Sequence, residues 1–289
     1  MANLRDIRDR IASVKNTQQI TKAMKMVAAA KLRKAQQRML QTRPYAAKLS
    51  EVIGKLADGS ETSSIFLKEK SNPSTALLVV VGSDRGLCGG FNNNLFKATE
   101  IYIQTELSSF KETNSLSLIT IGKKATEYFR KRDYKVVQAF PGFFDKLQYE
   151  KSAAIMRFVM ESFQKGAFES VYLSYNEFKT VISQERKIAQ ILPVPPIEGE
   201  GSSSDYIFEP SSEEILDSLI PLHLNTQLWK ALLESNASEQ GARMAAMDNA
   251  TENASEIIRQ LKLKYNQARQ AAITTEISEI VSGAEALSE

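Results

Sequence analysis

The stretch whose residue types could most readily bind a ligand is a glycine-rich loop from Gly82 to Asn92, which reads Gly-Ser-Asp-Arg-Gly-Leu-Cys-Gly-Gly-Phe-Asn. It follows a predicted strand and precedes a predicted helix, which is where open α/β sheets bind ligands. A phosphate-binding loop ends in Gly-Lys-Ser or Gly-Lys-Thr, because the lysine and the hydroxyl contact phosphate and magnesium. This loop lacks that ending and is not a G-x-G-x-x-G loop either. The sequence therefore favours a tight structural turn or a protein contact over a nucleotide site.

The other reactive side chains do not form a catalytic group. Cys88 has no histidine or second cysteine beside it, which predicts a structural thiol rather than a reactive one. His223, the only histidine, has no partner at metal-ligand spacing and is expected on a helix surface. Glu213 and Glu214 follow Ser211, so they fit the capped first turn of a helix better than a pair of catalytic carboxylates. We expect no active site, metal or cofactor in this chain.

Charge is unevenly distributed along the 289 residues. Lys and Arg number 37 against 34 Asp and Glu, yet residues 1–43 are strongly basic and contain only two acids, Asp6 and Asp9. Such a segment favours an acidic partner, a nucleic acid or an anionic membrane. Aromatic residues, which would stack on bases, are absent from residues 1–44, so nucleic-acid binding is disfavoured.

The hydropathy pattern predicts no insertion into a membrane. No run of about 18 apolar residues is present, and the first residues lack the apolar core of a secretory signal. We expect a cytoplasmic location, or one on the cytoplasmic face of a membrane through other proteins.

Two long helices are predicted at opposite ends of the chain, over residues 1–58 and 211–287. In each of them apolar or small residues recur every three or four positions, from Leu4 to Leu56 and from Ile215 to Leu287. Neither helix can bury its stripe alone, so we predict that they form an antiparallel coiled coil. The second helix is longer by roughly 20 residues, which leaves an apolar end around Ile273, Ile277 and Ile280 for another protein to cover.

Between the two helices, residues 74–196 alternate between strand and helix patterns. Strands are predicted at 77–81, 116–121, 135–139 and 170–175, with helices at 93–110, 124–131 and 149–164 and a further extended segment at 181–192. This alternation is typical of a doubly wound, mostly parallel α/β domain with a Rossmann-like arrangement. Residues 197–210, rich in glycine and serine, are predicted to be a flexible linker.

Four segments resemble a known family. They are Ile11-Ala-Ser-Val-Lys-Asn-Thr-Gln-Gln-Ile-Thr-Lys-Ala-Met-Lys-Met-Val-Ala-Ala-Ala30, Ser83-Asp-Arg-Gly-Leu-Cys-Gly-Gly90, Ser238-Glu-Gln-Gly-Ala-Arg-Met-Ala-Ala-Met-Asp-Asn-Ala250 and Ile273-Thr-Thr-Glu-Ile-Ser-Glu-Ile-Val-Ser-Gly-Ala284. Together they are similar to the gamma subunit of the F-type rotary ATP synthase. Plant chloroplast members carry an inserted cysteine pair for redox control, which the lone Cys88 excludes here, so the resemblance is to the bacterial type.

The resemblance implies a central shaft without catalytic residues of its own. Three alpha and three beta subunits would surround the coiled coil, while the epsilon subunit and the membrane ring of c subunits would contact the α/β-domain end. Proton flow would turn the c ring and the shaft, and the shaft would drive each beta subunit through its catalytic states. This chain would thereby couple proton flow to ATP synthesis or hydrolysis and regulate ATPase activity.

The resemblance also implies roles for individual residues. A beta-subunit loop would catch Arg269 and Gln270, with Thr274 and Glu276 one turn on, and a coupling network would include Met24 and Arg243. Contacts with the c ring and epsilon would fall near Phe208 and Glu209. Phe208 stands where the family often has Tyr, so it cannot donate the phenolic hydrogen bond, and Gly241 stands where many members have Ala or Ser.

Two other hypotheses remain open from the sequence alone. One is a nucleotide-binding regulatory α/β domain with a coiled-coil effector arm, against which the incomplete phosphate loop argues. The other is a coiled-coil export stalk, which would not need the central α/β domain.

Overall fold

The computed structural model describes residues 4–58, 64–70, 72–196 and 211–286. The predicted linker 197–210, with Phe208 and Glu209, lies outside these residues. The chain divides into two compact units, and each long helix contributes to both. We call residues 1–28 with 244–289 the coiled-coil unit, and residues 29–243 the α/β unit.

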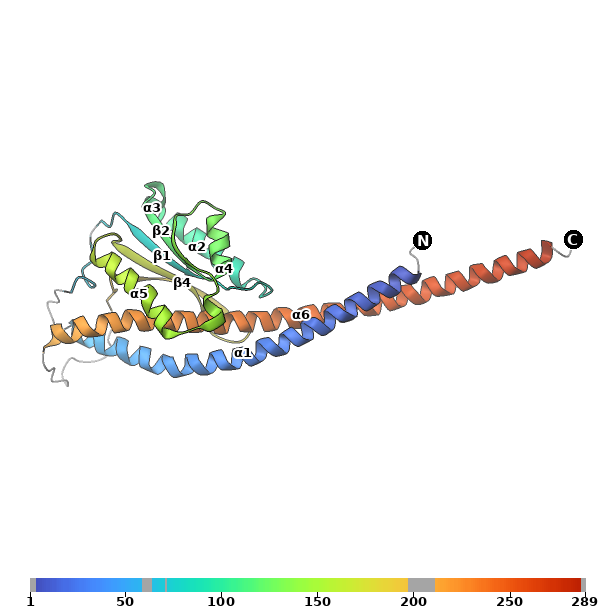
Figure 1. Ribbon diagram of the computed structural model, residues 1–289, viewed down its shortest axis with the longest axis horizontal. Helices are drawn as coiled ribbons and strands as arrows, with labels where there is room; N and C mark the ends of the chain where they lie inside the picture. Colours follow the sequence, from blue (N-terminus) through green and yellow to red (C-terminus); the bar gives the residue numbers. More distant parts are fainter. Residues whose placement is uncertain (1–3, 59–63, 71, 197–210, 287–289) are drawn as a thin grey trace. The chain divides into compact units, whose positions relative to one another are not determined.

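The two long helices are α1 (Leu4–Asp58) and α6 (Ser212–Ala286), and their bounds agree closely with the periodic patterns (Figure 1). Each continues through an internal proline, Pro44 in α1 and Pro221 in α6. The Ser211 hydroxyl accepts a hydrogen bond from the Glu214 backbone N–H at 3.3 Å, which is the predicted cap of the first turn.

In the coiled-coil unit α1 and α6 lie side by side and run in opposite directions. Side-chain hydrogen bonds join Arg8 to Tyr265 at 3.0 Å and Thr21 to Thr251 at 2.8 Å, and the ammonium of Lys25 pairs with the carboxylate of Asp248. The residue number falls along α6 as it rises along α1, which is the pairing of an antiparallel coiled coil. The buried apolar residues of this unit are small or flexible, and they include Ala28, Met247 and Ala254.

The α/β unit contains a five-stranded sheet in the order β3-β2-β1-β4-β5. Its strands are β1 (Ala76–Val81), β2 (Leu116–Ile121), β3 (Val136–Phe140), β4 (Ser170–Phe178) and β5 (Gln184–Leu192). The first four are mutually parallel, and β5 pairs antiparallel with β4. The predicted mostly parallel α/β architecture is confirmed, and the extended segment before Pro193 is an antiparallel edge strand.

Successive residues of β1 face opposite sides of the sheet and belong to two different cores. Ala76, Leu78 and Val80 pack with α2 (Phe91–Thr105), α3 (Ser108–Glu112) and α4 (Lys123–Arg130). Leu77, Val79 and Val81 pack with α5 (Tyr149–Gln164) and with the parts of α1 and α6 that belong to this unit. Both faces of the sheet are therefore covered by helices, as a continuous apolar strand requires.

Two local predictions need correction. The helix expected over 93–110 is two helices, because the chain turns at Glu106 and Leu107, and this turn lets both Leu107 and Phe110 enter the core. A short 3-10 helix, η1 (Phe143–Lys146), was not predicted.

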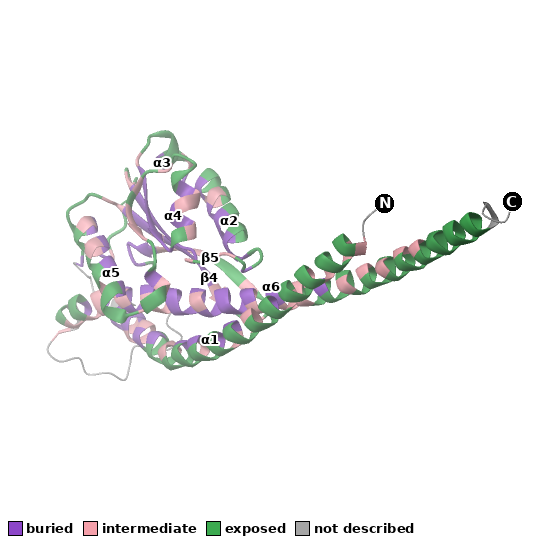
Figure 2. Ribbon diagram, turned by 45° about the vertical axis from the view of Figure 1, so that its right-hand side comes forward, coloured by how far each residue is buried: buried purple, intermediate pink, exposed green. Residues whose placement is uncertain are grey.

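Residues 220–243 of α6 are all buried or half-buried, and Figure 2 shows this part of the helix in purple and pink. Residues 231–235 are buried without interruption, whereas a narrow stripe would leave most of them exposed. The reason is that α6 packs against α1 residues such as Leu49 and Ile53 and also against the sheet core. The predicted surface position of His223 is consequently wrong, since this side chain is only 2% exposed.

Candidate functional site

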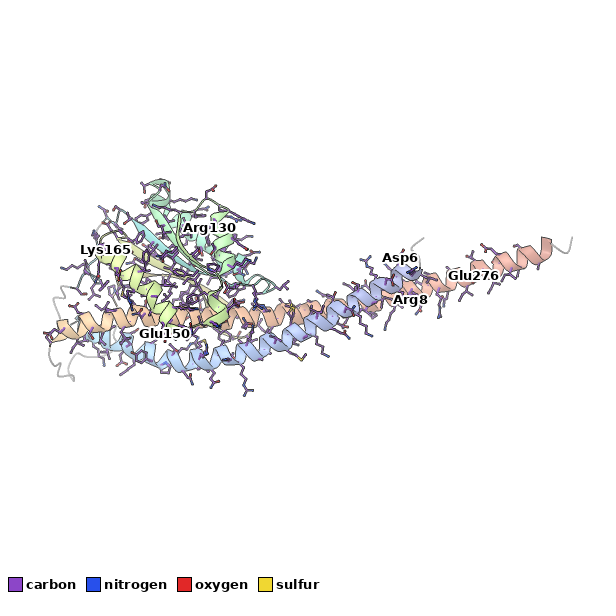
Figure 3. The ribbon with its side chains drawn as sticks, in the orientation of Figure 1. Asp6, Arg8, Arg130, Glu150, Lys165 and Glu276 are labelled. Atoms are coloured by element: carbon purple, nitrogen blue, oxygen red, sulfur yellow. The ribbon has the colours of Figure 1, made fainter. Side chains whose placement is uncertain are left out.

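The residues expected to meet the beta subunit lie on the exposed end of α6, within the coiled-coil unit. We call residues 269–284 the tip segment; all of them are exposed except Ala272, which is half-buried. Arg269, Gln270, Thr274 and Glu276 fall on neighbouring turns of one helix, and Figure 3 labels Glu276 on α6 beyond the level of Arg8 on α1. The structure thus brings these four predicted residues together on one stretch of helix surface.

The tip segment exposes large apolar side chains as well as polar ones. Ile273, Ile277, Ile280 and Val281 are 46%, 56%, 71% and 50% exposed. Residues four and seven apart share a helix face, so Arg269, Ile273, Glu276 and Ile280 form one stripe. Exposed apolar side chains gathered in this way are typical of a protein-interaction surface.

The predicted coupling residues Met24 and Arg243 belong to different units, and each is described within its own. Met24 is half-buried on α1. Arg243 is the last α6 residue of the α/β unit, and it is only 9% exposed. Its guanidinium pairs with the Glu239 carboxylate at 2.6 Å and donates to the backbone carbonyls of Arg85 and Gly86, each at 3.3 Å.

This ion pair is buried, and its partner groups come from α6 itself and the glycine-rich loop. Glu239 is 4% exposed, and burial raises the pKa of its carboxyl while the Arg243 charge opposes that rise. A buried carboxylate is stable only when it is paired, so Arg243 stabilises the charged form of Glu239 and ties the loop to the helix.

The glycine-rich loop is held by its own side chains. Asn92 accepts a hydrogen bond from the Ser83 N–H at 3.0 Å and donates to the Ser83 hydroxyl at 2.7 Å. Asp84 accepts hydrogen bonds from the N–H groups of Lys123, Gly142 and Phe144, at 2.9, 2.7 and 2.8 Å. These donors, one of them at the N-terminus of α4, are the kind that would bind a phosphate. Because a protein carboxylate already occupies them, the loop serves as a structural connection.

A second connection joins the hairpin between β4 and β5 to α6. A Cβ atom added at Gly241 would lie 2.8 Å from the backbone oxygen of Val181, so glycine permits this close approach. The Ser238 hydroxyl donates to the Asn176 carbonyl at 3.3 Å. From α1, Arg43 donates to the Phe178 carbonyl at 2.9 Å and pairs with the fully buried Glu234 at 3.2 Å.

Two further titratable side chains, Cys88 and His223, are buried. Burial raises the pKa of the Cys88 thiol, which agrees with the predicted inert cysteine. Burial lowers the pKa of His223 to about 4, and its imidazole shares a hydrogen bond of 2.7 Å with Gln227. Within the described ranges, no group of three His, Cys, Asp or Glu side chains is placed to hold a metal ion. None of the helices described there is both long and apolar enough to cross a bilayer.

Sequence reasoning missed most residues that hold α6 and the glycine-rich loop in the α/β unit. Glu239 and Arg243 had a readable signal, since opposite charges four residues apart face each other on a helix. Asp84, Glu234 and Gly241 had none, because their partners come from segments distant in the sequence.

The fold and these contacts define a class of protein in which a long coiled coil is joined to an α/β domain and one helix end is exposed. The family described as ATP synthase matches residues 3–287. The chain is 49% identical to the ATP synthase gamma chain of Chlorobaculum parvum and 50% identical to that of Chlorobaculum tepidum, with 99% of each chain covered. It belongs to the ATP synthase family, among the gamma chains that form the central shaft of that complex.

Solved structures agree with this assignment. The chain resembles the central stalk of the Tetrahymena thermophila mitochondrial ATP synthase at 27% identity and a TM-score of 0.59, over 80% of this chain and 99% of that one. A rotor chain of the Euglena gracilis enzyme, at 20% identity, has the same fold, with a TM-score of 0.66 over 93% of this chain and 98% of the other.

Proposed function

We propose that this chain is the rotating shaft that couples proton flow through a membrane sector to ATP synthesis or hydrolysis on beta subunits. The observation that supports this role most directly is the tip segment, whose exposed isoleucines require a covering protein. In this proposal three alpha and three beta subunits surround the coiled coil and cover the tip.

Coupling by a shaft requires contacts that differ between the states of its partners. A subunit that binds all three beta subunits equally could not shift any of them between binding, synthesis and release states. A single helix end presents different side chains in different directions, so each beta subunit meets a different face. We assign Arg269, Gln270, Thr274 and Glu276 to the loop of one beta subunit, with the apolar residues of the tip as a bearing surface.

At the other end we propose contacts with the epsilon subunit and the c ring near Phe208 and Glu209, on the cytoplasmic face of the cell membrane. Met24 and Arg243 are assigned to the coupling network. Arg243 suits this assignment because its guanidinium contacts both Glu239 of α6 and the backbone of the glycine-rich loop, so a movement of this side chain would affect both.

Catalysis in this proposal belongs to the beta subunits. The internal engagement of Asp84 and Arg243 supports that view, since the loop's donors and carbonyls are used within the chain. The chain would regulate ATPase activity through its contacts alone.

The test is co-expression with the alpha and beta chains of the same organism, followed by gel filtration and an ATPase assay. We expect a complex with three alpha, three beta and one copy of this chain, and a turnover rate that depends on its presence. The double variant Arg269→Ala/Gln270→Ala should lower turnover. Arg259→Ala/Gln260→Ala is the matched control, because it removes the same exposed dipeptide ten residues earlier on α6. Elution of the chain alone, with unchanged turnover, would refute the proposal.

A further inference from the structure

A cleft of about 490 Å³ opens in the α/β unit between α1, the glycine-rich loop, η1 and α6. Six cationic side chains line it: Lys31, Lys34, Arg38, Arg85, Lys146 and Arg243. Three acidic side chains line it too: Asp84, Asp145 and Glu239. The role proposed above uses Arg243 but none of the other five cationic side chains of this cleft.

The three acids are already engaged within the chain. Asp84 is held by three backbone N–H groups, Asp145 pairs with Arg85 at 3.4 Å, and Glu239 pairs with Arg243 at 2.6 Å. Among the described residues, the cleft cations left without a hydrogen bond or ion pair are Lys31, Lys34, Arg38 and Lys146. With six cationic and three acidic side chains, the cleft carries a surplus of positive charge.

The arrangement of this surplus favours an extended anion. Lys31, Lys34 and Arg38 are spaced three and seven residues apart, so they share one face of α1 and span roughly 10 Å along it. Lys146 comes from a different element, η1. Like charges placed this close repel one another unless a counter-charge lies between them.

The size of the cleft favours a small ligand over a segment of a macromolecule. Small-molecule sites commonly measure about 300–1,000 Å³, and this cleft falls in that range. Lysine and arginine side chains together are the usual partners of phosphate oxygens. Phe144 and Leu147 add some apolar lining that a nucleoside could contact.

We propose that this cleft binds a linear polyphosphate, either inorganic or carried by a nucleotide, through Lys31, Lys34, Arg38 and Lys146. The anion bridges α1 and η1 and so stabilises the α/β unit in proportion to its concentration. Binding is electrostatic and weakens as salt is added.

The experiment is isothermal titration calorimetry of the full chain with sodium tripolyphosphate and, in a second arm, with ATP, both without divalent cations. We expect one saturable site per chain. The variant Lys31→Gln/Lys34→Gln/Arg38→Gln should weaken binding at least about tenfold, because each exposed ion pair contributes roughly a factor of two to three. Lys146→Gln, a single change on η1, should weaken it about twofold to threefold.

The matched control is Arg10→Gln/Lys15→Gln/Lys22→Gln, which removes the same charge from exposed positions of α1 that do not line the cleft. Its affinity should stay within about twofold of the unchanged chain. Equal affinity for tripolyphosphate and ATP supports recognition of the phosphate chain alone, and tighter binding of ATP supports a nucleotide ligand. The absence of saturable binding, or an equal loss in the control variant, would overturn the proposal.

Discussion

The buried pair of Glu239 and Arg243 allows a sharp prediction about what holds α6 in the α/β unit. In Arg243→Met the carboxylate of Glu239 stays in a site where it is 4% exposed, without its counter-charge. Removing one partner of a buried ion pair costs about 3–5 kcal/mol. Since the carboxyl of Glu239 can take up a proton instead, we expect a loss near 3 kcal/mol of unfolding free energy at neutral pH.

Two comparisons distinguish the loss of the Arg243 charge from a general loss of packing. Glu239→Leu/Arg243→Met leaves no buried charge, so it should be more stable than Arg243→Met by about 2 kcal/mol. Burial already raises the pKa of Glu239 in the unchanged chain, and loss of the Arg243 charge raises it further in the single variant. Stability is then fully present below the unfolded pKa and falls as pH rises, so the loss should be smaller at pH 5 than at pH 8.

The assay is urea unfolding of the full chain, followed by circular dichroism at both pH values. The reasoning fails if the double variant is no more stable than the single one, or if the loss in Arg243→Met is the same at pH 5 and pH 8.

Three further predictions concern other positions. The pKa of His223 is lowered to about 4, below the usual 6.5, so the stability that its neutral form contributes above pH 6.5 is lost as pH falls to 4. His223→Leu should therefore flatten the pH dependence of the unfolding midpoint over that range, and an unchanged dependence would contradict this. Gly241→Ala should lower the thermal unfolding midpoint, because its Cβ would lie 2.8 Å from the Val181 carbonyl oxygen. Gly283→Ala, with open space around the added Cβ, should not lower the midpoint of the unchanged chain. Equal effects of the two substitutions would disprove the close-approach argument. Ile277→Asp should leave the unfolding of the isolated chain within about 0.5 kcal/mol yet weaken its assembly with alpha and beta chains on gel filtration, and normal assembly would count against the tip as a bearing surface.

Much of the architecture was predictable because it depends on local patterns. The spacing of apolar residues fixed α1 and α6 to within a few residues, and the apolar runs at β1 and β2 identified buried parallel strands. The alternation of strand and helix then implied helices on both faces of the sheet. The sequence contained no equivalent signal that α6 itself would cover one of those faces, and the surface position predicted for His223 failed for this reason.

Some parts of the candidate site were predictable from local patterns, and others were not. The unpaired apolar end of α6 was predicted by comparing the lengths of the two helices, whereas the contact residues Arg269, Gln270, Thr274 and Glu276 were predicted from the family resemblance. The contacts of Arg43, Asp84 and Gly241 join segments more than 35 residues apart, and their geometry depends on how the loops return to the helix. Side-chain periodicity carries no information about such contacts. The same holds for the cationic cleft, whose two walls meet only in the folded chain.

The most direct test of the shaft role is single-molecule observation of the complex formed with alpha and beta chains. The ring is fixed to a surface through the beta subunits, and a bead is attached to the α/β unit at an exposed position such as Lys97 on α2. We predict stepwise rotation of the bead in one direction when ATP is added, and loss of that rotation in Arg269→Ala/Gln270→Ala but not in Arg259→Ala/Gln260→Ala. A bead that stays still while the same complexes hydrolyse ATP at full rate would contradict the account.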